Sequence, residues 1–338
     1  SDRGLLDFNW LQSWQNKNSS EQDKFIKYAE GRLKTFEYIF ENLRTQAFGQ
    51  EKITTIKSEG AASGRLSLQY RMHPNIGDLV FQTFYNEDKL DEEESTYNKP
   101  VMDNKGMPKP RVCHPFVAPI EIKDKAIVWL DTPWCANDPK YEEQGDRQGK
   151  PRYTNDHEAE AIKSLLSQLR HETSPGSSIK IAVLSPYSQQ VALLRKKLAN
   201  IQLPSGLTFK ENLRVRKSGD DQASRAHSVD SFQGNEADVV IISLVRNNRI
   251  LSEDGLPKGL GFLDEVERLN VLLSRAEKML VLVGCWEFFE WHLEGVNIDN
   301  HSDSLWEWKK ILQMLTEAFN NRRAIKIPYS KIIKNGED

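Results

Sequence analysis

The stretch IKIAVLSPYSQQVALLRKKLA, residues 179–199, places an apolar run directly before an amphipathic segment. Residues 179–184 form a short run that is apolar except at Lys180, which is typical of a buried strand. Residues 188–199 carry apolar side chains at helical spacing. The stretch therefore predicts a strand followed by a helix.

The same strand-then-helix unit recurs along the chain. The further pairs are 126–131 before 155–170, 238–245 before 265–276, and 279–283 before 286–293. Such repetition favours an α/β fold with a parallel sheet covered by helices on both faces. In open sheets of this kind ligands collect at the carboxyl ends of strands, so residues directly after each strand are the first candidates for a site.

The regions around this core differ in pattern. Residues 1–60 predict a helical segment, and 61–295 form the main domain. Residues 86–119, with the acidic run 91–94, predict an irregular insertion. Residues 296–338 predict a C-terminal helical tail, in which Trp306 and Trp308 pack against the sheet rather than stack on bases.

Composition limits the classes of protein that fit. A net charge of −3 excludes a uniformly basic nucleic-acid coat but not a local basic patch. No apolar stretch approaches the roughly 20 residues that span a bilayer, and no apolar leader begins the chain, so we expect a cytoplasmic or nuclear location and no membrane. Cys113, Cys135 and Cys285 are far apart and lack close partners, which predicts reduced thiols and no metal site.

Two polar segments are candidates for ligand contacts. Ser185, Pro186 and Tyr187 lie where a strand end meets a helix N-terminus, a position that favours phosphates; the alternative is a capped helix start with Tyr187 packed inward. Residues 226–236 combine small polar groups, a glycine and a carboxylate, which suits a nucleotide surface; the alternative is a polar turn between strands.

Three arginines are further candidates. Arg268 and Arg275 are seven positions apart and would share a helix face, where one could meet a transferring phosphoryl group; helical arginines are more often solvated or paired. Arg71 lies at the boundary before a helix that starts at Pro74, a good position from which to reach a ligand. His73 has no partner at metal-ligand spacing, and we expect it to be structural.

Four strings in this order resemble the superfamily 1 helicases of the nonsense-mediated-decay and senataxin-like branch. They are QYRMHP at 69–74, SPY at 185–187 with Gln190, VDSFQG at 229–234 with Glu236, and NVLLSRA at 270–276. The likeness covers about residues 64 to 285. It implies the second RecA-like domain of a helicase, and the wording of the strings fits this branch better than the branch of opposite polarity.

The resemblance also implies roles for single residues. Arg71 and Arg275 correspond to arginines that contact the ATP γ-phosphate, and Glu236 and Gly234 to an ATP-binding pair. Ser185, Pro186, Tyr187, Ser228 and Ser231 fall where the family touches single-stranded DNA or RNA. Two departures, Glu267 in place of a usual arginine and Ser274 in place of threonine, leave both phosphate-contacting arginines in place.

The sequence lacks the other half of a motor. The one Gly-Lys pair, Gly149-Lys150, is followed by Pro151, so there is no phosphate-binding loop of the type Gly-x-x-x-x-Gly-Lys-Ser/Thr, and no apolar strand ends in Asp-Glu. The resemblance then implies that an upstream RecA-like domain supplies these groups and holds most of the Mg²⁺ that accompanies ATP, and that this chain alone is inactive. The alternatives are a non-catalytic nucleic-acid-binding or regulatory module, or a protein-interaction domain.

Overall fold

The computed structural model describes residues 71–85, 114–146, 152–172, 178–211, 225–251, 259–298 and 305–333. These residues contain a seven-stranded sheet in which every strand pair is parallel. Across the sheet the strands are β11 (Ala324–Pro328), β2 (Ile127–Asp131), β10 (Ala276–Gly284), β9 (Ala237–Ser243), β6 (Ile179–Ser185) and β7 (Leu207–Phe209), with β8 (His227–Ser228) beside β6. The predicted parallel sheet is confirmed.

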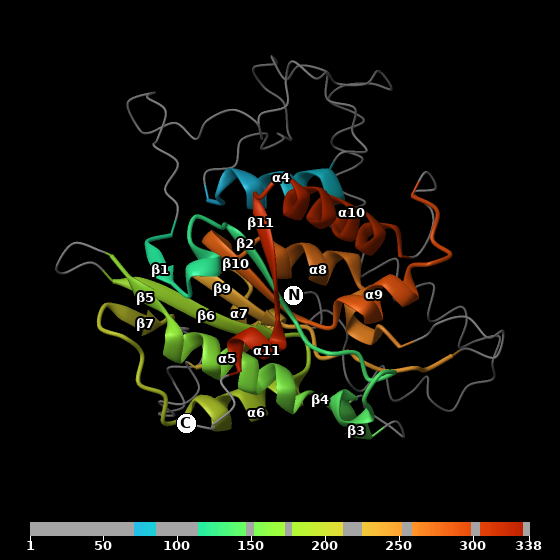
Figure 1. The fold of residues 1–338 in the computed structure, drawn as a ribbon, viewed down its shortest axis with the longest axis horizontal. Coiled ribbons are helices and arrows are strands. Elements are labelled where there is room, and N and C mark those ends of the chain that lie inside the picture. Colours follow the sequence, from blue (N-terminus) through green and yellow to red (C-terminus); the bar gives the residue numbers. More distant parts are fainter. Residues whose placement is uncertain are drawn as a thin grey trace, which may run out of the picture. The chain divides into compact units, whose positions relative to one another are not determined.

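Helices cover both faces of this sheet (Figure 1). One face carries α4 (Pro74–Phe84), α7 (Val229–Phe232), α8 (Val266–Leu273), α9 (Trp286–His292) and α10 (Trp306–Asn320), and the other carries α5 (Asp156–Gln168), α6 (Ser188–Leu198) and α11 (Tyr329–Ile332). Successive strand residues point to opposite faces, so Val240 and Ile242 enter one core and Val239 and Ile241 the other. A strand buried on both faces must be apolar throughout, which is why the apolar runs of the sequence mark it so clearly.

Smaller elements surround the sheet. β1 (Phe116–Ala118) pairs antiparallel with β5 (Arg170–His171), and β3 (Gln144–Asp146) pairs antiparallel with β4 (Arg152–Thr154). Three single turns of 3₁₀ helix are η4 (Ile120–Ile122), η5 (Pro139–Tyr141) and η8 (Gly261–Asp264). No helix in the described part of the chain is both long and apolar enough to cross a membrane.

Local chemistry fixes where two important helices begin. Pro74 starts α4, and the ring nitrogen of His73 accepts a hydrogen bond from the backbone N–H of Asn75 at 3.2 Å. Asn155 caps α5 by accepting from the backbone N–H of Glu158 at 3.2 Å. The structural role predicted for His73 matches this cap, and the cap holds Arg71 two residues before it.

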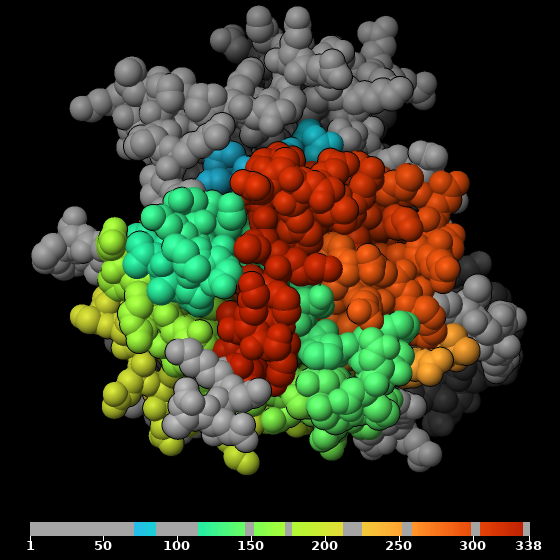
Figure 2. All heavy atoms as spheres, viewed as in Figure 1, coloured from blue at the N-terminus to red at the C-terminus, as the bar shows by residue number. Residues whose placement is uncertain are grey.

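The predicted strand-and-helix units agree with the observed ones to within three residues at each end. The tail predicted over 296–338 is not helical throughout, because β11 lies between α10 and α11 and joins the edge of the sheet beside β2. α10 lies against α4, and Figure 2 shows these segments, red and blue, side by side on the surface. Trp308 stacks on Phe289 at 4.4 Å, as expected of a residue that packs rather than binds bases.

Several expectations lie outside the described residues. They concern the helical segment 1–60, most of the insertion predicted over 86–119, and Cys113. A division by backbone contacts separates Ser1–Ser67 from Leu68–Asp338, and all described residues belong to the second unit.

Candidate functional site

Arg71 and Glu236 lie 165 residues apart in the sequence and form an ion pair, with Arg71 Nε 2.5 Å from a carboxylate oxygen of Glu236. Arg71 Nη1 also donates to the backbone carbonyl of Ser274 at 3.1 Å. The two side chains are 34% and 46% exposed, so this pair is accessible to a ligand. We call Arg71, Glu236 and Arg275 the arginine cluster.

Arg275 joins the cluster from the end of α8. Its Nε donates to the carbonyl of Val271 at 2.8 Å, its Nη2 to the hydroxyl of Ser274 at 3.2 Å, and its Nη1 to the carbonyl of Asn235 at 3.4 Å. Partial burial lowers the pKa of Arg275, as does nearby Arg71, while Glu236 opposes this shift. Because two guanidinium groups face one carboxylate, the cluster has a net positive charge and favours an anion.

Gly234 shapes the turn that presents Glu236. Its φ is +86°, in the left-handed region that a side chain disfavours. A β-carbon there would meet no atom within 4 Å, so the backbone conformation rather than crowding requires glycine. The turn closes with a hydrogen bond from Asn235 N to Phe232 O at 2.9 Å.

The arginine cluster lies at the amino ends of β9 and β10. Glu236 directly precedes β9, Arg275 directly precedes β10, and Ala237 N donates to Arg275 O at 3.2 Å. The expectation that ligand candidates collect at the carboxyl ends of strands is therefore wrong for these residues. The physical reason is that each belongs to the loop that enters a strand, not to the loop that leaves it.

The expected pairing of Arg268 and Arg275 on one helix face is also wrong. α8 ends at Leu273, so Arg275 lies beyond the helix. Arg268 instead pairs with Glu265 at 2.9 Å and Asp230 at 3.7 Å, as the alternative of a paired surface arginine predicted.

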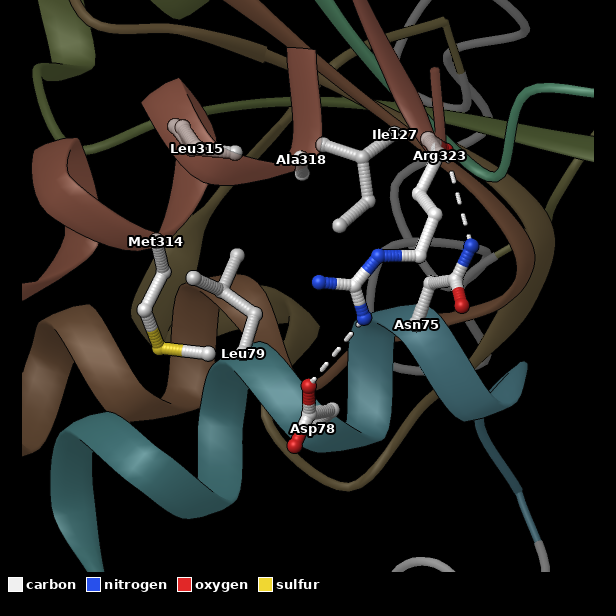
Figure 3. Close-up of a pocket in the computed structure, with 8 residues that line it drawn as sticks. All are labelled: Asn75, Asp78, Leu79, Ile127, Met314, Leu315, Ala318 and Arg323. Atoms are coloured by element: carbon white, nitrogen blue, oxygen red, sulfur yellow. Dashed lines mark hydrogen bonds and ion pairs between the residues drawn. The ribbon is translucent and has the colours of Figure 1, made fainter. Parts of the chain in front are cut away.

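A small pocket lies between α4, α10 and the start of β11, shown in Figure 3. Asp78 and Arg323 point toward one another there and form an ion pair at 3.8 Å. The cavity of about 20 Å³ has room for about one water molecule. It is too small for a nucleotide, so the exposed arginine cluster is the better candidate for one.

Two of the residues predicted to touch single-stranded nucleic acid, Ser185 and Ser228, lie on adjacent β-strands, and the others lie just after these two strands. Ser185 ends β6 and pairs in register with Ser228 of β8. Ser228 caps α7 by accepting from Ser231 N at 3.2 Å, and the Ser231 hydroxyl donates to Ser228 O at 2.9 Å. Both hydroxyls are half-buried and already serve the helix start.

Tyr187 packs inward, the alternative that its sequence context left open. Its ring is 1% exposed, and its hydroxyl donates to the carbonyl of Leu260 at 2.9 Å. Burial raises the pKa of Tyr187 to about 12. The side chain of Ser185 is buried too. A nucleic-acid strand at the carboxyl end of β6 would therefore meet the protein backbone and the half-exposed ring of Pro186. Contact with a strand stays a prediction.

A buried ion pair behind this edge escaped the sequence analysis. Arg246, three residues after the end of β9, pairs with Glu143 at 2.9 Å, and each side chain is 2% exposed. The guanidinium lies 3.9 Å from the ring centre of Tyr153 and donates to the hydroxyl of Tyr187 at 3.3 Å. Gly261, at φ +60°, leaves room for it, since a β-carbon there would lie 2.8 Å from Arg246 Nη1. The available signal was an arginine directly after a strand predicted to be buried.

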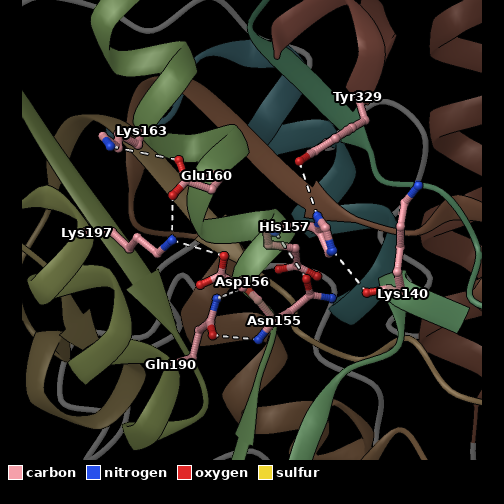
Figure 4. A network of polar contacts seen from close by, with 10 residues as sticks. Lys140, Asn155, Asp156, His157, Glu160, Lys163, Gln190, Lys197 and Tyr329 are labelled. Atoms are coloured by element: carbon pink, nitrogen blue, oxygen red, sulfur yellow. Dashed lines mark hydrogen bonds and ion pairs between the residues drawn. The ribbon is translucent and has the colours of Figure 1, made fainter. Parts of the chain in front are cut away.

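Gln190, part of one quoted string, belongs to a second buried network rather than to an exposed site. Its amide exchanges hydrogen bonds with the backbone of Asn155, at 2.8 and 3.0 Å (Figure 4). It also donates to the hydroxyl of Ser243 at 2.9 Å, which donates in turn to Glu158 at 2.6 Å. Glu158 accepts the backbone N–H of Val245, at 2.9 Å from each carboxyl oxygen. The network fixes the chain as it leaves β9.

Glu158 makes the stability of the fold depend on pH. Burial raises its pKa from 4.5 to about 8, so the folded protein retains a proton that the unfolded chain releases. Unfolding then releases a proton between these two values, and the free energy of unfolding is expected to fall as pH rises from about 4.5 to about 8. Urea titrations across this range should show that Glu158→Gln lacks this decline. Glu160→Gln, on the same helix, is the control, and an unchanged slope in Glu158→Gln would contradict the assignment.

The described residues contain no group of three or more His, Cys, Asp or Glu that could hold a metal ion. Cys135 and Cys285 are buried free thiols, and burial raises the pKa of Cys135 to about 11.

Comparison with known proteins gives a consistent result. Residues 48–287 match the family described as an AAA domain. The chain is 31% identical over 251 residues to DNA polymerase alpha-associated DNA helicase A of Saccharomyces cerevisiae, covering 73% of this chain and 31% of that protein. It is 29% identical to an uncharacterized ATP-dependent helicase of Methanocaldococcus jannaschii (68% of this chain, 28% of that protein) and 29% identical to Regulator of nonsense transcripts 1 of Dictyostelium discoideum (65% and 13%). The chain thus spans less than a third of the length of each of these relatives.

Proposed function

Because the chain belongs to the AAA domain family, we propose that it is the second motor domain of an ATP-dependent DNA or RNA helicase or translocase. The matches confirm the predicted resemblance to superfamily 1 helicases, so the chain is a helicase-type domain. The observation that carries the proposal is the arginine cluster, in which three residues from distant parts of the sequence meet at one accessible place.

In the proposed site the cluster faces the phosphate chain of ATP from across a cleft between two motor domains. Arg71 and Arg275 stabilise the negative charge that develops on the transferred phosphoryl group. Their guanidiniums are held by the carbonyls of Ser274 and Val271, so little rearrangement is needed when the reaction occurs. Glu236 binds ATP beside them, with a carboxylate that can accept a sugar hydroxyl.

The other catalytic groups come from an upstream domain in this proposal. The sequence has no phosphate-binding loop of its own, and in this proposal the lysine of that loop and most of the Mg²⁺ ligands belong to the upstream domain. When bound, Mg²⁺ neutralises charge on the phosphates. This chain contributes the arginines and the glutamate and does not turn over ATP alone.

Single-stranded nucleic acid binds, we propose, at the carboxyl end of β6, around Ser185, Pro186 and Ser228. The carboxyl end of β6 and the arginine cluster lie at opposite ends of the parallel strands. The short segment 228–236 joins the two ends, because Ser228 lies beside the carboxyl end of β6 and Glu236 directly precedes the amino end of β9. A shift of this segment is a direct route by which ATP hydrolysis could move the strand.

The test is a comparison of ATPase rates with and without the upstream domain. We expect no hydrolysis by this chain alone, and hydrolysis stimulated by single-stranded DNA or RNA when the longer protein is used. If the longer protein shows no hydrolysis with any strand but binds strands, the proposal fails and a non-catalytic binding module takes its place. If it binds no strand, a protein-interaction domain becomes the better interpretation.

A further inference from the structure

Tyr85 directly follows α4, and its hydroxyl meets the C-terminal end of α8, which the arginine cluster also contacts. The side chain of Asn270 donates its amide N–H to Tyr85 Oη at 2.7 Å. Tyr85 is 40% exposed, one of few large apolar residues on the surface of the described part of the chain. An exposed tyrosine held by a single side-chain hydrogen bond is oriented but still open to a ligand.

Asn270 lies in the last turn of α8, and the arginine cluster contacts this turn and the residue that follows it. The backbone N–H of Ser274 donates to Asn270 O at 3.1 Å, and Arg275 Nε donates to the carbonyl of Val271, the next residue. Residues four apart on a helix lie on the same face. Tyr85 is also close enough to Arg275 to act on the pKa of its guanidinium. The hydroxyl and both arginines therefore converge on one end of α8.

The hydrogen bond from Asn270 leaves the hydroxyl proton of Tyr85 available for donation to a ligand. A tyrosine hydroxyl has one proton to donate and can accept as well. Here it accepts from the amide, and within the described residues its own proton has no acceptor. A donor without an acceptor, fixed near the Arg275 guanidinium, is suited to an anionic oxygen.

We propose that Tyr85 is a third phosphate-binding group of this site, beside Arg71 and Arg275, which donates a hydrogen bond from its hydroxyl to an oxygen of the phosphate chain of bound ATP, with Asn270 holding the hydroxyl in place. The inference rests on the proposed function, since it takes ATP as the ligand of the arginine cluster. A neutral donor adds a contact to the phosphates without adding a third positive charge to the mutual repulsion of Arg71 and Arg275.

The test uses the longer protein and the variant Tyr85→Phe, which removes the hydroxyl and keeps the ring. We expect the Kd for AMP-PNP and the KM for ATP to rise about tenfold, the effect of one lost hydrogen bond to a charged group. The strand concentration that half-activates hydrolysis and the Tm should not change. Asn270→Ala, which leaves the hydroxyl unoriented, should raise the same two constants by a smaller factor.

Tyr329→Phe is the matched control, because its hydroxyl also meets a side chain, His157 at 3.3 Å, but lies on the opposite face of the sheet. It should keep wild-type constants. Wild-type AMP-PNP affinity in both Tyr85→Phe and Asn270→Ala, with Arg275→Ala inactive, overturns the inference and leaves the proposed function standing. A change in Tm or strand activation that matches the change in affinity assigns Tyr85 a structural role only. Full activity in Arg275→Ala overturns both.

Discussion

Replacing Arg275 by alanine is expected to lower the strand-stimulated ATPase rate of the longer protein at least a hundredfold. An arginine that reaches the transferred phosphoryl group contributes about three to five orders of magnitude to turnover in known phosphoryl-transfer enzymes. Arg275 is the better placed of the two arginines for this role, because three hydrogen bonds already fix its guanidinium. The measurement is the steady-state rate at saturating strand, with Tm as the check on folding.

Arg268→Ala is the matched control for this prediction. Arg268 lies on α8, the helix that ends just before Arg275, and its partners are the exposed carboxylates of Glu265 and Asp230. Surface pairs of this kind contribute little to stability or function, so we expect a rate close to that of the wild type. Equal rates in Arg275→Ala and Arg268→Ala would show that Arg275 is not a catalytic residue.

The elements of this fold could be predicted because their signals are local. Every residue of the run 179–184 except Lys180 is apolar, and such a run is typical of a strand that is buried on both faces of a sheet. β11 lacked such a signal, since Lys326 interrupts its five residues and only its pairing with β2 defines it as a strand. The residues of the arginine cluster were predicted one by one from a resemblance to a family. Their position at the amino ends of β9 and β10 could be seen only in the structure.

Burial of single polar residues could not be predicted in the same way. Tyr187 was open to two interpretations because its environment is set by Leu260 and Gly261, which are distant in the sequence. The partner of Arg246, Glu143, lies in a segment with no regular pattern of its own. Such contacts depend on how segments meet in space, and neither composition nor periodicity contains that information.

The largest effect on stability is expected from Glu143→Ala. Truncation leaves the guanidinium of Arg246 buried without its carboxylate, and breaking a buried pair in this way costs about 3 to 5 kcal/mol. Glu143 also accepts hydrogen bonds from the backbone N–H of Asn247 and from the side chain of Asn248, which would lose their acceptor. Urea unfolding of the chain, followed by circular dichroism, measures the loss.

Two variants separate the pair from its surroundings. Asp138→Ala removes the carboxylate of an exposed pair with Lys140, whose side chains are 41% and 61% exposed, and should leave the unfolding midpoint unchanged. The double variant Glu143→Leu with Arg246→Met replaces both charges by apolar groups, and it should be more stable than Glu143→Ala because no buried charge is left unpaired. If Glu143→Ala unfolds at the same urea concentration as Asp138→Ala, the buried pair does not stabilise this edge of the sheet.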